Sequence, residues 1–161
     1  MGGYLAQLGT AEGLRAVAVA AETDEDLVRS FGATDFVARG EGAAQRVRDL
    51  FPDGVDAVAD AAVLGDGIVG AIRNGGQIAS FRAYDADPGR GIRSHVLNVR
   101  ERATDHAAIS RLRELAEEGV LSMRVGRVLP AAETTEAHRL MERGGTRGRI
   151  VLEFPVMETD K

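Results

Sequence analysis

The sequence contains no cysteine and no tryptophan, and its aromatic residues are limited to five Phe and two Tyr. Without cysteine the chain forms no disulfide, no thiolate zinc site and no cysteine nucleophile. So few aromatic side chains leave little material for a surface on which nucleic-acid bases could stack. The three histidines share no metal-ligand spacing, and we therefore expect no metal site.

Long apolar runs and a basic surplus are also absent. No run approaches the roughly 20 apolar residues that a membrane span needs, and no basic segment precedes an apolar one as in a signal peptide. The formal charge of −5 argues against nucleic acid or an anionic membrane as a main partner. These features predict a soluble, cytoplasmic protein with an ordinary globular composition.

Short apolar runs bounded by turn-forming residues alternate with segments of helical spacing, which is typical of an α/β protein with a parallel sheet. Strands are predicted at residues 15–21, 35–38, 56–62, 76–81, 125–130 and 149–154. The run at 56–62 is expected to be buried on both faces. Ligands of such sheets bind at the carboxyl ends of the strands, so residues 60–62 are predicted to line any small-molecule site.

The helical segments are marked by apolar spacing and by turn-forming residues at their ends. Helices are predicted at 2–13, at 24–31 with Thr23 as its cap, at 40–51, around 68–73, at 104–119 and at 132–142. Ile109, Leu112 and Leu115 are expected to form the buried stripe of the helix at 104–119. The whole is predicted to be one domain over residues 1–155, and the tail at 156–161 is expected to fray.

Three stretches in this order resemble the cofactor-binding half of the medium-chain dehydrogenase/reductase superfamily, on its zinc-independent, quinone oxidoreductase-like branch. They are Asp26–Asp35, Asn74–Ile78, and Ala137–Met141 followed by Gly148–Leu152. The resemblance implies a Rossmann-like fold, NADPH or NADH as cofactor, a two-fold dimer, and hydride transfer to a quinone, enone or carbonyl.

The chain departs from the family pattern at its beginning. Family members open this domain with an apolar strand and a glycine-rich turn, of which Gly2 and Gly3 resemble the end, and a catalytic domain precedes both. An internally placed start codon and a genuine truncation both explain the difference. We expect a Rossmann-like sheet without its first, central strand. The two strands that would flank it then pair directly with each other, pair with a borrowed strand, or leave an open gap. No catalytic residue can be named.

The resemblance also predicts which residues contact the cofactor: Gly2, Gly3, Ala21, Glu22, Ala61, Ala62, Ser80, Phe81 and Arg149. Glu22 begins an acidic cluster that reaches Asp26 with no Lys or Arg beside it, and a carboxylate there favours NADH by repelling a 2′-phosphate. A solvated helix start explains the same acids. Cofactor binding is expected to be weak because most of the phosphate-binding turn is missing.

Other residues leave the function open. Asp56 and Asp60 share a strand face, and either act in acid–base chemistry or cap a turn and orient a loop. The apolar segment 92–99 is expected to form a sheet edge that pairs with its copy in a homodimer, which Leu97→Pro should dissociate. The alternative to a reductase half is a stand-alone scaffold with little cofactor binding, which acts as a binding or assembly module or as a cofactor-independent enzyme.

Overall fold

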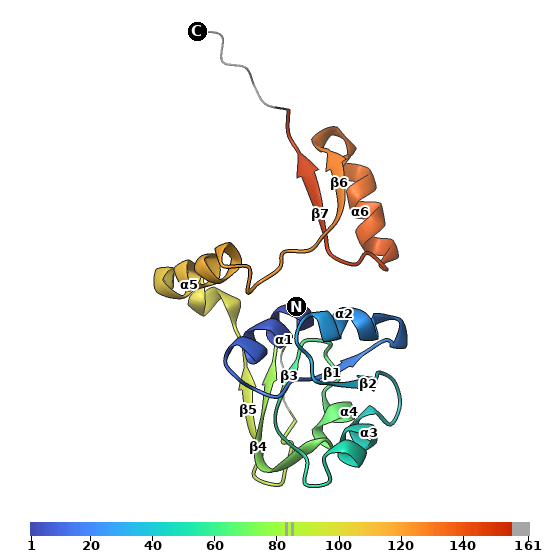
Figure 1. The fold of residues 1–161 in the computed structure, drawn as a ribbon, viewed down its shortest axis with the longest axis vertical. Helices are drawn as coiled ribbons and strands as arrows, with labels where there is room; N and C mark the ends of the chain where they lie inside the picture. The colour runs from blue at the N-terminus through green and yellow to red at the C-terminus, as the bar shows by residue number, and fades with distance from the viewer. Residues whose placement is uncertain (83, 85, 156–161) are drawn as a thin grey trace. The chain divides into compact units, whose positions relative to one another are not determined.

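The computed structural model describes residues 1–82, 84 and 86–155. The chain forms two compact units, Met1–Leu121 and Ser122–Lys161 (Figure 1). The single domain predicted over residues 1–155 stays a prediction, and the tail predicted to fray, 156–161, lies outside the described residues. None of the described helices combines the length and the apolar character that a bilayer crossing requires.

The first unit alternates short helices with parallel strands, as the sequence predicts. Its elements are α1 (Gly2–Ala11), β1 (Val17–Ala20), η1 (Glu22–Asp24), α2 (Glu25–Ser30), β2 (Asp35–Ala38), α3 (Ala43–Leu50), β3 (Val55–Asp60), α4 (Asp66–Val69), β4 (Ile72–Ser80), β5 (Arg93–Val96), η2 (Val99–Arg102) and α5 (His106–Glu117). The predicted α/β class with a parallel, Rossmann-like arrangement is confirmed.

The sheet of this unit is in two pieces. β1 pairs with β2, while β3 pairs with β4 and β4 with β5, and every pair is parallel. No pairing joins β1 to β3 among the described residues. Side chains of both strands, such as Val19 and Val58, nevertheless pack against the same apolar core around Ile72 and Ile78. The two pieces are therefore held together by apolar packing, and the predicted interruption takes the form of an open gap.

Burial along β3 differs from the prediction. Val58 packs against the core and Asp60 is buried, but Ala57 and Ala59 on the opposite face are exposed. The expectation of a strand buried on both faces is wrong, because the face that carries the two alanines is exposed to solvent. Small apolar residues suited to a covered face are here left in contact with solvent.

The structure also differs from three expectations about the helices. The segment at 68–73 is not one helix, since α4 stops at Val69 and Ile72 begins β4. The N–H of Val55 donates to the carbonyl of Ala71 (2.9 Å), so this carbonyl pairs with β3 and does not continue the helix. Thr23 does not cap α2; it lies inside η1. On α5 only Leu115 of the expected stripe is buried; Ile109 and Leu112 are both 48% exposed.

The second unit is a single βαβ arrangement. It consists of β6 (Val125–Pro130), η3 (Ala131–Glu133), α6 (Thr134–Arg143) and β7 (Arg149–Glu153). β6 and β7 pair in parallel, with a register irregularity between Val125 and Arg127. These elements confirm the predicted strand–helix–strand order at the end of the chain.

Gly54→Ala is expected to lower the free energy of unfolding by about 3 kcal/mol. Gly54 has φ +87°, and a Cβ there would lie 2.7 Å from both the Ala71 oxygen and the Arg73 nitrogen. Gly75 has φ +70° with nothing within 4 Å of an added Cβ, so Gly75→Ala is a matched control with a loss near 1 kcal/mol. Thermal or urea unfolding measures the free energy of unfolding of both variants. Equal losses would show that the close backbone approach at Gly54 does not contribute to the cost of the added Cβ.

Candidate functional site

The carboxyl ends of β3 and β4 lie side by side. Asp60, the last residue of β3, is the register partner of Ser80, the last residue of β4. Ala61 and Ala62 directly follow β3, and Phe81 follows β4. The structure therefore brings four of the predicted cofactor residues to one edge of the sheet, where ligands of parallel sheets bind.

Ser80 is the polar group at this edge that lacks a partner. Its side chain is buried, and its hydroxyl oxygen has no hydrogen-bond partner among the described residues. It lines a cavity of about 20 Å³ together with Asp60, Val63 and Tyr84, which is far too small for a nucleotide ring. A buried hydroxyl without a partner is unfavourable by about 1–3 kcal/mol, and a ligand oxygen or nitrogen at the strand ends would relieve that cost.

Asp60 organises the loop after β3. Its side-chain oxygens accept hydrogen bonds from the N–H groups of Leu64 and Gly65, both at 2.9 Å. Between them and the strand, Val63 has φ +60°, a region that β-branched residues rarely adopt. The interpretation that Asp60 orients a neighbouring loop is confirmed, since its carboxylate holds this turn in place.

Asp56 does not share the environment of Asp60. Its side chain is 88% exposed, and it forms a 2.6 Å ion pair with Arg73. The suggestion from the sequence that Asp56 caps a turn is therefore wrong. One carboxylate is buried and engaged with backbone amides and the other is in solvent with a cation, so the two do not form a paired acid–base site.

Tyr84 is a residue of this edge that sequence reasoning missed. Its hydroxyl donates to Asp66 at 2.6 Å, and its ring lies beside Gly65. The hydrogen bond to the Asp66 carboxylate, followed by burial and the negative charge of Asp66, raises the pKa of Tyr84 to about 12. No motif in the sequence around Tyr84 or Asp66 indicates this pair.

Raising the pH through about 10.5 is expected to leave the Tyr84 phenol mostly protonated in the folded protein, whereas Asp66→Asn should bring its ionisation towards the ordinary value near 10. A group whose pKa is raised on folding stabilises the native state below its unfolded pKa, and that contribution is lost as the pH rises through the folded value. Ultraviolet absorbance of the phenolate measures the ionisation of Tyr84 in a protein that also carries Tyr4→Phe. Identical titration curves with and without Asp66 would contradict the assignment.

The remaining predicted residues of the first unit lie at β1 and α1. Ala21 follows β1, and Glu22 begins η1 with an exposed side chain. The acidic cluster does have a basic neighbour, because Arg29 pairs with Glu25 at 2.7 Å, one helical turn away. The expectation of a cluster without Lys or Arg is thus wrong for Glu25.

The two glycines differ in their surroundings. Gly2 has open space around an added Cβ, whereas a Cβ on Gly3 would lie 2.8 Å from the ring of Phe31. Gly3 therefore has a packing role at the start of α1, which does not depend on a ligand. Arg149 begins β7 in the second unit, and its place beside the strand ends of the first unit stays a prediction.

Comparison with known families and structures gives consistent matches. The sequence pattern of the family described as zinc-binding dehydrogenase matches residues 31–152, whereas no curated protein sequence matches significantly. A solved NAD-dependent alcohol dehydrogenase is 26% identical with a TM-score of 0.74, covering 92% of this chain and 46% of its own.

Two mycobacterial structures are similar to the chain as well. A quinone oxidoreductase is 25% identical with a TM-score of 0.79, covering 94% of this chain and 52% of its own. A protein complexed with NADPH is 25% identical with a TM-score of 0.76, covering 92% and 51%. The chain therefore spans about half the length of these structures.

The family description names zinc, and the residues that the structure describes do not fit that metal. The described residues contain no group of three His, Cys, Asp or Glu side chains placed to hold an ion, and the sequence supplies no cysteine. Structural and catalytic zinc sites need at least three such ligands.

Proposed function

The chain belongs to the zinc-binding dehydrogenase family, and from that premise we propose that it binds a nicotinamide dinucleotide as the cofactor-binding half of an oxidoreductase acting on a quinone, enone or carbonyl. The observation that carries the proposal is the buried hydroxyl of Ser80 at the carboxyl ends of the strands, which has no hydrogen-bond partner within residues 1–82, 84 and 86–155. Such an orphaned group fits a polar atom of a cofactor laid across this edge.

The bound cofactor would supply the hydride, and the residues of this chain would hold and orient it. Ser80 would exchange a hydrogen bond with it, and Ala61 and Ala62 are small enough for a ring or ribose to approach the backbone closely. Glu22, exposed at the end of β1, would accept hydrogen bonds from ribose hydroxyls and repel a 2′-phosphate, which favours NADH over NADPH. Gly2 and Gly3 would present N–H groups at the start of α1 to the phosphates.

Ser80→Ala tests the proposal with two readouts of opposite sign. Removal of an unsatisfied buried hydroxyl is expected to leave the free protein as stable or raise its free energy of unfolding by about 1 kcal/mol. The same change is expected to weaken NADH binding roughly tenfold, because the cofactor loses a hydrogen-bond partner in a buried place. Thermal unfolding and titration calorimetry measure the two effects.

Ser94→Ala is the matched control, since Ser94 lies exposed in β5 of the same unit. We expect it to change neither stability nor NADH binding. Unchanged NADH affinity in Ser80→Ala would separate the hydroxyl from the cofactor and remove the main support for the proposed function.

We also infer a homodimer through residues 92–99. β5 is the edge strand of the β3–β4–β5 sheet, and all four of its residues are exposed. Val96, Leu97 and Val99 are 52%, 43% and 73% exposed, which is more apolar surface than a free sheet edge usually carries. Pairing with the same strand of a second copy around a two-fold axis would cover these side chains and satisfy the outward backbone groups.

A further inference from the structure

The hydroxyl of Ser80 is closed off from solvent at the strand ends. Ser80 is 4% exposed, and its hydroxyl has no hydrogen-bond partner among the described residues. It shares its small cavity of about 20 Å³ with two residues of the loop after β3 and two that follow β4: Val63, Gly65, Arg82 and Tyr84. A cavity of this size holds about one water molecule. No atom of a dinucleotide therefore reaches the hydroxyl unless the covering residues move.

The loop after β3, residues 61–65, is held at two places. At its base the carboxylate of Asp60, which is 5% exposed, accepts the N–H groups of two loop residues at 2.9 Å each. At its far end the hydroxyl of Tyr84 donates to Asp66 at 2.6 Å, and a Cβ on Gly65 would lie 3.5 Å from the Tyr84 ring. The second hold is one hydrogen bond to an exposed carboxylate, so water competes with it more readily than with the buried bonds.

The closed position of the loop is not favourable in itself. Val63 has φ +60°, an unfavourable conformation for a β-branched residue. Val63 and Leu64 are 54% and 41% exposed, so opening would remove little apolar contact. The closed loop also keeps the hydroxyl of Ser80 away from any partner outside the cavity. These features favour opening, and the hydrogen bonds at the two holds oppose it.

We propose that residues 61–65 form a lid over the strand ends, that the Tyr84–Asp66 hydrogen bond keeps the lid closed, and that a nicotinamide dinucleotide contacts Ser80 only when the lid opens. This inference rests on the proposed function and adds a gating step to it. The apparent dissociation constant of a ligand rises as the binding-competent state becomes rarer. The wild-type chain is therefore expected to bind the cofactor more weakly than a variant that lacks this hydrogen bond.

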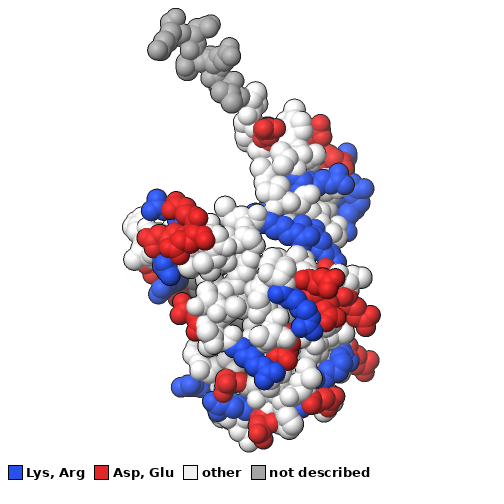
Figure 2. Space-filling model, viewed as in Figure 1, with Lys and Arg blue, Asp and Glu red and all other residues white. Residues whose placement is uncertain are grey.

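Titration of the 161-residue protein with NADH tests the gating step. Figure 2 shows acidic side chains gathered over η1 and α2, next to the end of β1, where they would repel the 2′-phosphate of NADPH. NADH is therefore the probe. Tyr84→Phe keeps the ring and removes the donor, and we expect it to bind NADH roughly threefold to tenfold more tightly than the wild type.

Hydrogen exchange measures the lid without any cofactor. Opening of the lid breaks the bonds from Asp60 to the N–H groups of Leu64 and Gly65. Tyr84→Phe is expected to accelerate exchange at these two amides roughly threefold to tenfold, because the opening becomes less costly. Asp66→Ala should reproduce both effects, and its combination with Tyr84→Phe should add nothing further, since both changes remove the same bond.

Asp49→Ala is the matched control for Asp66→Ala. Asp49 lies on α3 and likewise accepts one side-chain hydrogen bond at the surface, from Gln45 at 2.9 Å. We expect wild-type NADH affinity and wild-type exchange of the lid from it. Circular dichroism establishes that each variant is folded, and Asp66→Ala serves as the second probe if Tyr84→Phe is not.

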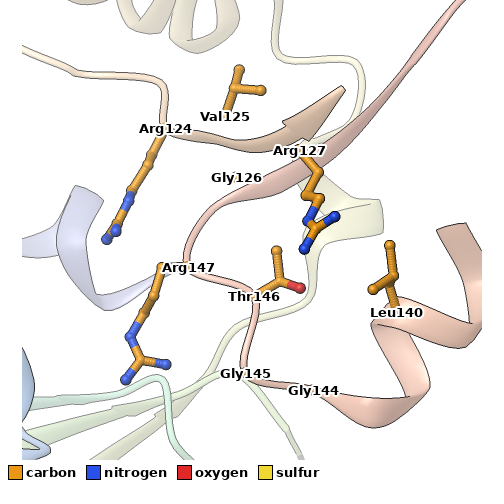
Figure 3. Close-up of a pocket in the computed structure, with 9 residues that line it drawn as sticks. All are labelled: Arg124, Val125, Gly126, Arg127, Leu140, Gly144, Gly145, Thr146 and Arg147. Atoms are coloured by element: carbon orange, nitrogen blue, oxygen red, sulfur yellow. The ribbon is translucent and has the colours of Figure 1, made fainter. Parts of the chain in front are cut away.

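A further control concerns the larger cavity of the second unit, of about 530 Å³. Figure 3 shows that the side chains of Arg124 and Arg147 extend away from that of Arg127, so these side chains do not converge on one anionic group. Arg127→Ala, made in the Tyr84→Phe protein, should leave the NADH affinity unchanged. Loss of NADH binding in that protein would place the cofactor in the second unit and overturn the inference.

The two readouts separate the lid from the cofactor site. Unchanged exchange at Leu64 and Gly65 in Tyr84→Phe would overturn the lid, whatever the NADH titration gives. Faster exchange with wild-type NADH affinity would overturn the coupling between the lid and binding. If neither the wild type nor Tyr84→Phe binds NADH at about 10 mM, the proposed function fails and the gating step fails with it, whereas the exchange rates still decide whether the Tyr84–Asp66 hydrogen bond holds the lid.

Discussion

Replacement of Asp60 with alanine is expected to lower the free energy of unfolding by about 3 kcal/mol and to release the loop after β3. Asp60 is 5% exposed, and its carboxylate accepts the N–H groups of Leu64 and Gly65. Without it these amides lose a charged acceptor, and the left-handed backbone of Val63 at φ +60° loses its support. Chemical unfolding measures the loss, and hydrogen exchange at Leu64 and Gly65 measures the release.

Asp56→Ala is the matched control on the same strand and the same face. Its carboxylate is exposed and pairs with one exposed arginine, so its loss should be below about 1 kcal/mol. Asp60→Asn keeps one acceptor oxygen and should fall between the two alanine variants. A stability loss in Asp60→Ala no larger than in Asp56→Ala would show that the carboxylate does not hold the loop.

Val96→Pro is expected to dissociate the proposed homodimer, with at least a roughly tenfold increase in its dissociation constant. The N–H of Leu97 donates to the carbonyl of Ser80 at 2.8 Å, so the donor of Leu97 points into the sheet. Successive residues of a strand direct their backbone groups to opposite sides, and the N–H of Val96 therefore points outward. Analytical ultracentrifugation across a concentration series measures the change.

Leu97→Pro, the change that the sequence suggested for dissociating the dimer, is therefore unsuitable. It would remove the hydrogen bond from Leu97 to Ser80 in β4 and disturb the sheet itself. Val128→Lys is the control for Val96, because Val128 lies in β6 of the other unit with a similar exposure of 56%. It should leave the dimer intact. A monomer at tens of micromolar for the unmodified protein, or dissociation by Val128→Lys alone, would reject an interface through β5.

The positions of the strands along the chain were predictable because they depend on local sequence patterns. Runs of small and β-branched residues between turn formers mark β2, β6 and β7 closely, and glycines such as Gly32, at φ +93°, end helices where expected. Burial was less predictable. The exposure of Ala57 and Ala59 depends on which elements cover a face, and this is a long-range property that an apolar run alone does not encode.

The candidate site divides in the same way. Residues at strand ends, Ala61, Ala62, Ser80 and Phe81, follow from the rule that parallel strands present ligand sites at their carboxyl ends. The Tyr84–Asp66 pair joins residues 18 positions apart through a loop whose course no motif marks. The sequence identified Glu22, which is exposed. It did not reveal that the nearby Glu25 pairs with Arg29, because a pair four residues apart can be recognised only when the helix is placed correctly.

The central claim is that the strand ends of the first unit bind a nicotinamide dinucleotide, and amide resonances followed during NADH titration test it most directly. We expect gradual, saturable shifts at Ala21, Ala61 and Ser80, with an affinity weaker than micromolar and a smaller response to NADPH. Shifts confined to other parts of the chain, or none at about 10 mM NADH, would contradict the claim.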